Sequence, residues 1–384
     1  MKILHVISSV NPKGGGVIEG VKQLCSQYPS LGVSAEIACL DEPSSPCISQ
    51  VDMPPIHALG AGRGGYSYSS RLVPWLLVNS SRFDAVIVDG IWQYHSFAVW
   101  RALAGGPTPY FVFTHGMLDP WFKTTYPLKH LKKWLYWPWA DYRVLRDASA
   151  VIFTCEEERM LARKSFWLYK ANEAVTAYGS SGPIGDGRIL RENFFATYPS
   201  LRGKRLVLFL SRIHVKKGCD LLISAFARVA EGDPNLHLVM VGPDQTGWAS
   251  TLKEQANSLG IADRITWTGM LEGEQKWGAY YASEVFCLPS HQENFGIVVA
   301  EALACGKPVL ISNKVNIWRE VEADGAGFVA DDTVEGTVQN LRRWLAQTPA
   351  EYQAMAKSAA QSFSSRFHVS RAAERLVEII KETG

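Results

Sequence analysis

The sequence lacks any apolar run approaching the ~20 residues that a membrane-spanning helix needs. Charge of one sign is not in excess either, since 39 Lys and Arg stand against 37 Asp and Glu, for a formal net charge of +2. So small a charge gives no overall basic field suited to nucleic acid. We therefore expect neither an integral membrane protein nor a nucleic-acid-binding protein, and we expect any membrane contact to be peripheral.

Paired cysteines are also missing, because the seven cysteines are scattered and none belongs to a Cys-x-x-Cys pair. An odd number of cysteines, many inside apolar runs, is typical of reduced core thiols in a cytoplasmic protein. The first residues, MKILHVISS, form too short an apolar run for a signal peptide and predict a buried strand instead. These absences together favour a cytoplasmic location.

Familiar metal and nucleophile motifs are missing as well. The sequence has no HExxH pair or Asp-x-Asp motif that would indicate a metal site. It also has no G-x-S-x-G elbow and no convincing cysteine nucleophile. Enzymes that depend on these signatures are therefore disfavoured.

What the sequence does contain is a regular alternation of short β-rich runs with helical patterns. Such alternation is the signature of parallel sheets covered on both faces, and 384 residues suit two domains better than one. We predict an α/β fold of two doubly wound, Rossmann-like domains facing a central cleft, where strand ends bind ligand. The predicted strands are 2–8, 34–40, 83–89, 109–115, 149–155, 174–178, 205–211, 236–242, 264–269, 284–290 and 307–312.

The alternation is interrupted between residues 179 and 203. This segment begins with YGSSGPIGDG, a run rich in turn-forming residues, and predicts an interdomain connection. We place the N-terminal domain at 1–185 and the C-terminal domain at 203–364. The remaining segment, 365–384, contains an amphipathic helical pattern that the second sheet does not require.

Two glutamates eight positions apart, Glu293 and Glu301, are the most informative feature of the chain. An Asn-Phe-Gly turn follows Glu293, and an apolar helix that should begin near Phe295 or Gly296 and stop before Gly306 carries Glu301. The first amides of that helix, at Gly296, Ile297 and Val298, have no partner within the helix and form a ready anion site. A diphosphate on the helix tip, with a sugar on one side and a ribose on the other, fits this layout. Alternatively, Glu301 is a buried carboxylate that satisfies a neighbour, and Glu293 is a charge favoured by the helix dipole.

A pair of basic residues follows the strand at 205–211. Arg212 comes directly after the strand, and Lys217 precedes Gly218 at the start of the next helix. Arginine can bind two oxygens of a diphosphate at once, whereas lysine acts as a point charge. The alternative is that Arg212 and Lys217 are two solvated loop cations. Asp220, two residues after Gly218, could serve only as a cap of the following helix.

These stretches resemble the E-x7-E signature and the G/S-R-x4-KG-x-D motif of retaining glycosyltransferases of the GT-B architecture, in the fourth family of sequence-based classification. The resemblance covers nearly the whole chain and is most specific at 212–220, Met270 and 291–308. It implies a C-terminal helix that crosses back onto the first domain, so that 365–384 joins it. It also implies catalysis with no essential metal and no cofactor, because protein cations and helix tips neutralise the leaving diphosphate. One departure is YGSSGPIGDG, which replaces the more usual Asn-Gly-Val turn.

The resemblance also implies roles for individual residues of the second domain. Arg212 and Lys217 would bind the donor diphosphate together with the helix tip. Glu293 would lie beside the donor sugar with Asn294 and Phe295, whereas Glu301 would bind the ribose. The nucleobase would lie against the loop after the strand at 264–269, lined by Met270 and Leu271, although these residues could equally be apolar residues entering a helix.

In the first domain, three consecutive glycines at 14–16 follow the first strand. They let a ligand approach the backbone closely, so Gly15 and Gly16 are candidates for contact with the donor phosphate, although flexible turns also use glycine. His115 ends the strand at 109–115 within HGML, which is similar to a recurring family motif. We interpret it as a catalytic-site residue that binds a donor sugar hydroxyl rather than as a satisfied core histidine. On the acceptor side, Trp92, Gln93 and Tyr94 could bind sugar or could equally be packing residues.

Residues 121–140 are the most ambiguous stretch, because lysines alternate there with tryptophans, leucines and tyrosines. A basic, tryptophan-rich helix suits a membrane interface with anionic lipids. It is also consistent with an amphipathic helix whose aromatic residues are buried against the sheet and whose lysines are solvated. We favour this second interpretation.

The function predicted from these features is a retaining glycosyltransferase that moves a hexose from a nucleotide-sugar donor, with UDP-glucose as the best guess. Its acceptor would be a hydroxyl of a glycan or lipid-linked sugar in envelope polysaccharide synthesis. Two alternatives remain open: a nucleotide-sugar 2-epimerase of the same fold, and a non-catalytic protein that binds a nucleotide sugar.

Overall fold

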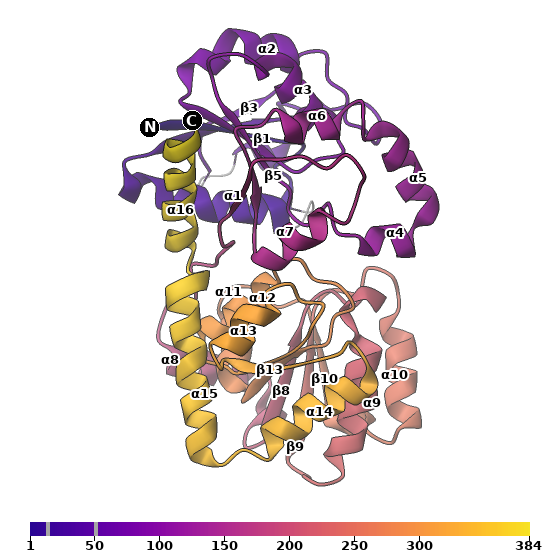
Figure 1. The fold of residues 1–384 in the computed structure, drawn as a ribbon. Helices are drawn as coiled ribbons and strands as arrows, with labels where there is room; N and C mark the ends of the chain where they lie inside the picture. The colour runs from indigo at the N-terminus through magenta and orange to yellow at the C-terminus, as the bar shows by residue number, and fades with distance from the viewer. Residues whose placement is uncertain (13–15, 50–52) are drawn as a thin grey trace. The chain divides into compact units, whose positions relative to one another are not determined.

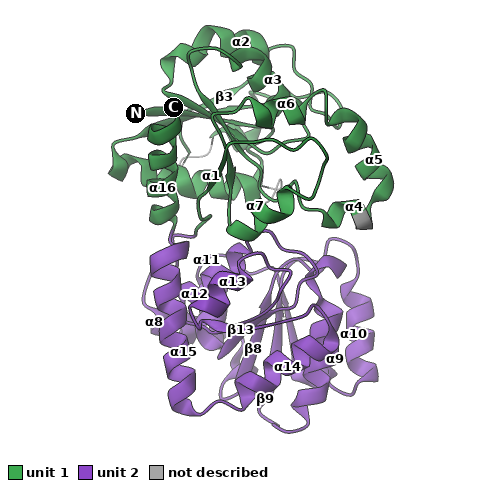
Figure 2. Cartoon of the chain, viewed as in Figure 1, with its two compact units in different colours: residues 1–179, 369–384 green, residues 180–368 purple. Residues whose placement is uncertain are grey.

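The computed structural model describes residues 1–12, 16–49 and 53–384 of the chain. They divide into two compact units, coloured separately in Figure 2. Unit 1 comprises Met1–Gly179 and Val369–Gly384, and unit 2 comprises Ser180–His368. The predicted fold class is confirmed, because each unit is built on a parallel sheet with helices packed against it.

Within the described residues of unit 1, seven parallel strands form one sheet in the order β3-β2-β1-β4-β5-β6-β7 (Figure 1). Adjacent side chains along each strand face opposite sides of the sheet. In β1, for example, Leu4 and Val6 join one apolar core, whereas Ile3 and Ile7 join the other. The strands are β1 (Lys2–Ile7), β2 (Ser34–Cys39), β3 (Ile56–Ala58), β4 (Ala85–Asp89), β5 (Tyr110–Phe113), β6 (Ala150–Phe153) and β7 (Glu173–Val175).

Helices cover both faces of this sheet. Apolar residues of α2, α3 and α6 complete the core that contains Leu4, and residues of α1 and α16 complete the core that contains Ile3. The helices of unit 1 are α1 (Gly16–Gln27), α2 (Leu72–Asn79), α3 (Tyr94–Leu103), α4 (Trp121–Thr125), α5 (Pro127–Tyr136), α6 (Asp141–Arg146), α7 (Glu156–Ala162) and α16 (Val369–Thr383).

Unit 2 has a six-stranded parallel sheet in the order β10-β9-β8-β11-β12-β13. The order reverses between β8 and β11, so the loops after these two strands meet at the switch point where doubly wound sheets bind ligands. The strands are β8 (Arg205–Leu210), β9 (Leu236–Val241), β10 (Ile265–Gly269), β11 (Val285–Leu288), β12 (Val309–Ser312) and β13 (Gly327–Ala330). The helices are α8 (Gly187–Thr197), α9 (Cys219–Ala230), α10 (Ala249–Ser258), α11 (Gly273–Ala282), α12 (Ile297–Ala304), α13 (Trp318–Ala323), α14 (Val334–Leu345) and α15 (Pro349–Ser362).

All predicted strands are present, and two further strands, β3 and β13, were missed. β3 has three residues and β13 has four, and most of their residues are only half-buried. A short, half-buried strand lacks the continuous apolar run that identifies the central strands of a parallel sheet.

The interdomain connection predicted for residues 179–203 is wrong over most of its length. From Ser180 onward these residues belong to unit 2, and Gly187–Thr197 form α8, which packs along α11. The apolar residues Leu190, Phe194 and Phe195 are buried, and Asp186 caps the helix by accepting from the N–H of Arg188 at 2.7 Å. The turn-forming residues at the start of the segment predict a connection, whereas the amphipathic pattern of residues 187–197 predicts a helix.

Gly278 makes the close packing of α8 on α11 possible. A Cβ atom at Gly278 would lie 2.4 Å from the carbonyl oxygen of Leu190 and 2.8 Å from the Cβ of Phe194. We expect Gly278→Ala to lower the free energy of unfolding by about 1–3 kcal/mol, because the two helices must separate. Urea unfolding would measure it. Gly232→Ala is the matched control, since a Cβ there would meet its nearest neighbour at 3.8 Å; equal losses in both variants would contradict this account.

The chain returns to unit 1 at its C-terminal end. After α15, a π-helical turn (Phe363–Phe367) leads to α16, which packs against α1 within unit 1. The buried side of α16 is apolar, and the hydroxyl of Thr176 donates to the carbonyl of Ala372 at 3.1 Å. The amphipathic pattern at the C-terminal end therefore belongs to a helix whose apolar face completes the core of unit 1.

Candidate functional site

In unit 2, the loop after β8 carries the two predicted phosphate-binding cations. Arg212 is exposed, whereas Lys217 is buried at the end of a short 3-10 helix, Val215–Lys217. Gly218 ends this turn with φ of 66° and begins α9. A Cβ at Gly218 would lie 2.2 Å from the carbonyl oxygen of Pro289, so only glycine fits between the two loops. The turn therefore holds Lys217 against the loop that follows β11.

Lys217 and Glu293 form a direct ion pair between these two loops. The backbone of Glu293 is fixed on both sides, because its N–H donates to Lys314 at 2.9 Å and its carbonyl accepts from the N–H of Asn316 at 3.0 Å. The Glu293 side chain remains partly exposed. It is therefore a positioned carboxylate that still has access to a ligand.

The charges around Glu293 hold it in the ionised form. Burial raises the pKa of Glu293, but the positive charges of Lys217, Lys216 and Arg212 outweigh this effect and lower the pKa below its ordinary value. The structure thus brings Arg212, Lys217 and Glu293 into one electrostatic cluster, and their binding of a diphosphate stays a prediction.

Helix α12 begins directly beside this cluster. Its N-cap, Gly296, has φ of 71°, and the helix starts at Ile297, one residue after the later of the two predicted starts. The first N–H groups, including those of Ile297 and Val298, lack carbonyl partners within the helix and carry its positive dipole end. Phe295 is buried and packs edge-on against Phe367 at 5.7 Å, whereas Asn294 accepts from the side-chain amide of Asn316 at 3.4 Å. Phe295 therefore anchors the loop, and Asn294 remains half-buried beside Glu293.

Glu301 lies further along α12, buried and held by two side chains of α11. Its Oε1 accepts from Lys276 at 2.7 Å, and its Oε2 accepts from the hydroxyl of Tyr280 at 3.1 Å. The same hydroxyl lies 3.1 Å from the carbonyl oxygen of Val298. Neither Lys276 nor Tyr280 is among the residues predicted from the sequence, although their spacing of four residues on a helix places both on one face.

The predicted base-lining residues follow β10. Met270 is exposed and Leu271 is half-buried, so neither is a core residue. Their loop leads into α11, the helix that carries Lys276 and Tyr280. The loop that the sequence associates with the nucleobase and the helix that holds Glu301 are thus consecutive in the chain.

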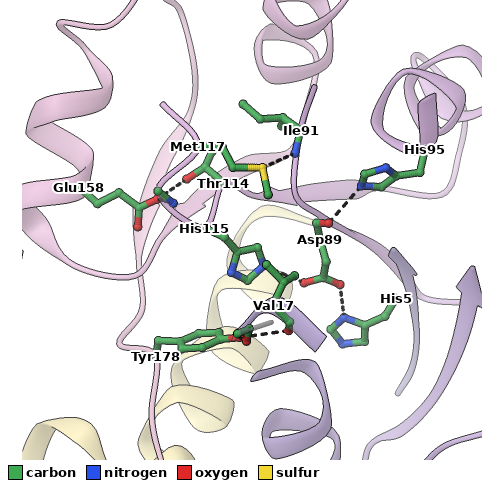
Figure 3. A network of polar contacts seen from close by, with 12 residues as sticks. His5, Val17, Asp89, Ile91, His95, Thr114, His115, Met117, Glu158 and Tyr178 are labelled. Carbon is green, nitrogen blue, oxygen red and sulfur yellow. Dashed lines mark hydrogen bonds and ion pairs between the residues drawn. The ribbon is translucent and has the colours of Figure 1, made fainter. Parts of the chain in front are cut away.

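In unit 1, one predicted glycine can be placed. Gly14 and Gly15 lie outside the described residues, whereas Gly16 is the exposed first residue of α1. The carbonyl oxygens of Gly16 and Val17 both accept from the hydroxyl of Tyr178, at 2.9 and 3.2 Å. The Tyr178 ring meets the ring of His115 edge-on at 5.5 Å. Tyr178 therefore connects the start of α1 to His115, as Figure 3 shows.

His115 belongs to a buried polar network centred on Asp89, at the end of β4 (Figure 3). Asp89 binds His115 Nε2 at 3.2 Å through one carboxylate oxygen and His5 Nδ1 at 2.7 Å through the other. His5 Nε2 in turn lies 2.9 Å from the hydroxyl of Tyr28. Burial raises the pKa of Asp89, but the two histidines outweigh it and lower the value to about 2. Asp89 was missed in the sequence, although an aspartate ending a buried strand is an unusual residue.

A second buried carboxylate, Glu158, fixes the loop that carries His115. Its two oxygens accept from the hydroxyl of Thr114 and the N–H of Gly116 at 2.6 Å each, and from the N–H and hydroxyl of Thr154 at 2.7 and 2.6 Å. His115 itself has φ of 49°, a left-handed conformation that is uncommon outside glycine. Unusual backbone that is this firmly held is typical of binding and catalytic loops.

The predicted acceptor-side residues differ in their accessibility. Trp92 also has a positive φ, 73°, and its ring lies near Phe166 while its Nε1 donates to the carbonyl of Met117 at 2.9 Å. Tyr94 is buried, whereas Gln93 is half-buried and donates to Ser67 at 3.4 Å. These contacts favour packing for Trp92 and Tyr94 and leave Gln93 as the more accessible polar group.

The interpretation of residues 121–140 as buried aromatics with solvated lysines holds for Lys123, Lys129 and Lys132, which are exposed, but fails for several of the aromatic residues. Trp137 is fully buried, but Trp134, Leu135 and Trp139 are exposed, and no residue of α5 is buried. Lys133 instead turns inward, with its Nζ 4.4 Å from the centre of the Trp92 ring. Periodicity predicted the helix correctly but not which face turns towards the protein.

Among the described residues, no helix is long and apolar enough to cross a membrane. The same residues contain no group of three His, Cys, Asp or Glu side chains that could hold a metal ion. The expectation of catalysis without metal or cofactor stays a prediction.

Two family models match the chain, one in each half. Residues 15–179 match the model of the glycosyl transferase 4-like domain, and residues 191–362 match that of glycosyl transferases group 1. The first range includes β2 to β7 of unit 1 but not β1, and the second range includes all six strands of unit 2.

Several curated relatives match the chain over only part of its length. The chain is 32% identical to mannosylfructose-phosphate synthase of Agrobacterium fabrum over 39% of its own length and 33% of that protein. It is 34% identical to D-inositol 3-phosphate glycosyltransferase of Rhodococcus opacus over 41% of its length and 37% of that protein. These alignments thus span only about a third of each relative's length. A GDP-mannose:cellobiosyl-diphosphopolyprenol alpha-mannosyltransferase of Xanthomonas campestris matches at 23% identity over 96% of this chain and 93% of that protein.

Solved structures share the complete fold. Anabaena HepE, in complex with UDP and glucose, superposes with a TM-score of 0.78 at 18% identity and covers 100% of both chains. Sucrose-phosphate synthase from Thermosynechococcus elongatus gives a TM-score of 0.77 at 18% identity, covering 100% of this chain and 99% of that one. Each half of the chain therefore matches a glycosyltransferase model, the group 1 model over residues 191–362 and the 4-like model over residues 15–179, and the chain shares the two-domain GT-B fold of these solved structures.

Proposed function

We propose that the protein is a retaining glycosyltransferase that moves a hexose from a nucleotide-diphosphate donor to a hydroxyl acceptor. The observation that carries the proposal is the cluster of Arg212, Lys217 and ionised Glu293 beside the start of α12. Two cations and a helix N-terminus offer a diphosphate what it needs, namely positive charge and free N–H groups.

The barrier would be lowered mainly at the leaving group. As the bond from the anomeric carbon to the diphosphate breaks, negative charge grows on the phosphate oxygens, which Arg212, Lys217 and the α12 amides would stabilise. The acceptor hydroxyl would attack from the face that the leaving group vacates and would lose its proton to a phosphate oxygen. Glu293 would position the sugar and support positive charge at its anomeric carbon.

We propose that Glu301 of unit 2 binds the ribose. Glu301 is a buried carboxylate whose position is fixed by Lys276 and Tyr280. A carboxylate can accept hydrogen bonds from both hydroxyls of a diol. Met270, exposed on the preceding loop, is available to line the base. We propose UDP as the nucleotide and glucose as the sugar.

The acceptor is proposed to be a growing glycan or a lipid-linked sugar of the cell envelope, with the protein in the cytoplasm or at the inner face of the membrane. The Xanthomonas relative, whose name specifies a diphosphopolyprenol-linked acceptor, supports this choice. So does the exposed apolar face of α5, considered further below.

The decisive experiment incubates the protein with a panel of nucleotide sugars and follows release of the nucleoside diphosphate. A transferase should release it slowly by hydrolysis without acceptor and faster when an acceptor is added. Direct interconversion of donors without diphosphate release would instead indicate a 2-epimerase. Binding without turnover, unaffected by Glu293→Gln, would indicate a non-catalytic nucleotide-sugar-binding protein.

For the ribose assignment, we expect Glu301→Gln to raise the KM for UDP-glucose about ten- to a hundredfold with little change in kcat. The variant loses charge-assisted hydrogen bonds of about 1.5–3 kcal/mol that ground state and transition state share. Steady-state kinetics with varied donor would measure the effect. Glu274→Gln is the control, since Glu274 is an exposed carboxylate on α11 that contacts Asn193 at 3.2 Å. An unchanged KM in Glu301→Gln would refute the assignment.

A further inference from the structure

Helix α5 is oriented with its apolar side away from the protein. Leu128, Leu131 and Leu135 are three and four positions apart and therefore share one face of the helix. Their side chains are 78%, 54% and 61% exposed. Within unit 1, Figure 1 shows α5 at the periphery, away from the strands. An apolar helix face that points outward is the reverse of the arrangement that stabilises a surface helix.

The opposite face of α5 makes the contacts with the rest of unit 1, and it is polar. His130 stacks on the ring of Phe166 at 4.8 Å, and Lys133 lies over the rings of Trp92 and Phe122 at 4.4 and 5.5 Å. These residues are three positions apart, so they share a face. Because aromatic rings hold the polar face, the leucines are fixed outward and are not exposed by a loosely attached helix.

Other exposed apolar residues border the three leucines. Trp134 lies 5.9 Å from the ring of Trp167, in the loop after α7, and Trp139 and Leu168 are exposed as well. The loop is tied to this region by the hydrogen bond from Trp137 Nε1 to the carbonyl of Trp167, at 2.8 Å. We call this surface the docking face: Leu128, Leu131, Leu135, Trp134, Trp139, Trp167 and Leu168.

Residues 120–140, which carry most of the docking face, contain charged side chains of one sign only. Residues 120–140 contain four lysines and no aspartate or glutamate, and Lys129 and Lys132 are exposed beside the leucines. An anionic lipid surface complements both properties, since apolar side chains enter the acyl boundary while lysines contact headgroups. A second copy of the chain fits poorly, because a twofold contact would bring the same lysines together.

We propose that the docking face binds the surface of an anionic lipid bilayer, with the three leucines inserted and α5 parallel to the membrane plane. Tryptophans at the border suit the headgroup level, where their rings and N–H groups are both accommodated. The proposal goes beyond the transferase activity, and its readout requires no nucleotide sugar. Its failure is therefore distinguishable from failure of the proposed function.

The test is flotation of the full-length protein with vesicles of phosphatidylcholine alone or with about one third phosphatidylglycerol. We expect binding to the anionic vesicles, and at least about tenfold weaker partitioning for Leu128→Ser/Leu131→Ser/Leu135→Ser. The control is Leu77→Ser/Val78→Ser on α2, where the side chains are 62% and 76% exposed in the same unit. Lys129→Gln/Lys132→Gln should weaken binding to anionic vesicles selectively.

Three outcomes would overturn the proposal. The first is that the wild type fails to float with anionic vesicles. The second is that the leucine variant floats as well as the wild type, and the third is that the α2 control loses as much binding as the leucine variant. Sedimentation velocity supplies an independent measurement. A wild-type dimer that the leucine variant disperses, combined with no flotation, would show that a second copy covers the docking face instead.

Discussion

Lys217→Ala is expected to lower the rate of donor cleavage about 100-fold or more, the usual effect of removing one preorganised group that stabilises a leaving charge. Lys217 is buried and paired with Glu293, so no other side chain can take its position without moving a loop. Initial rates of diphosphate release from UDP-glucose would measure the loss. Lys216→Ala is the matched neighbour, and we expect it to lose less than about tenfold because water screens its charge more.

A structural role for Lys217 can be separated from phosphate binding. Removing the lysine leaves Glu293 as an uncompensated, partly buried carboxylate, which by itself could disturb the loop. Lys217→Ala/Glu293→Gln removes both charges. UDP lacks the transferred hexose that Glu293 is proposed to contact, so the Kd for UDP reports on the phosphate site without that contact. If the double variant binds UDP as tightly as the wild type, Lys217 serves only to hold Glu293, and the phosphate assignment is wrong.

Asp89→Asn is expected to lower the free energy of unfolding of unit 1 by about 3 kcal/mol, because breaking a buried charged network leaves its partners unsatisfied. Asp89 binds both His5 and His115, and it is buried at the end of β4. Urea unfolding followed by tryptophan fluorescence would measure the loss. Asp84→Asn is the control, since Asp84 is exposed and accepts from the N–H of Lys2 at 2.6 Å; it should cost less than about 1 kcal/mol.

The free energy of unfolding should also depend on pH through Asp89. The pKa of Asp89 is about 2 in the folded protein, below the ordinary value of 3.8. A lowered folded pKa contributes stability that is fully present above about pH 4 and is lost as the pH falls towards about 2. Asp89→Asn cannot show this loss, so its stability should fall less steeply than that of the wild type over that interval. Parallel curves would contradict the lowered pKa.

Asp89→Asn also tests whether the Asp89 network affects turnover without affecting the binding of UDP. The donor cluster lies in unit 2, so the Kd for UDP should stay near the wild-type value while turnover falls if His115 contacts the sugar. A variant that keeps both UDP binding and turnover would show that His115 is a satisfied core residue, the alternative considered from the sequence.

The parallel sheets were predictable because most of their strands are continuous apolar runs in the sequence. Buried on both faces, β1, β4 and β8 have no polar alternation to confuse with a helix. β3 and β13 escaped notice because short, half-buried strands carry no such run. The segment at 180–202 was misassigned because its first residues favour turns, whereas α8 is stabilised by packing on α11 across Gly278.

The candidate site was likewise predictable from the sequence only in part. By itself, the sequence determined what lies close in the chain: the Gly296 helix start between Glu293 and Glu301, and the Arg212–Lys217 loop, because turn and helix geometry act over a few residues. The tertiary structure alone decided the partners of these groups, Lys276 and Tyr280 for Glu301 and Asp89 for His115, since they depend on which strands and helices become neighbours.

Helix α5 shows the same division at the surface. The sequence determined which of its residues share a face, because a helix turns by a fixed angle per residue. Only the tertiary structure decided that Lys133 and His130 face the protein and the leucines face outward. The physical reason is that periodicity fixes the separation of the two faces, whereas the aromatic rings of Trp92, Phe122 and Phe166, contributed by other segments, select the face that packs.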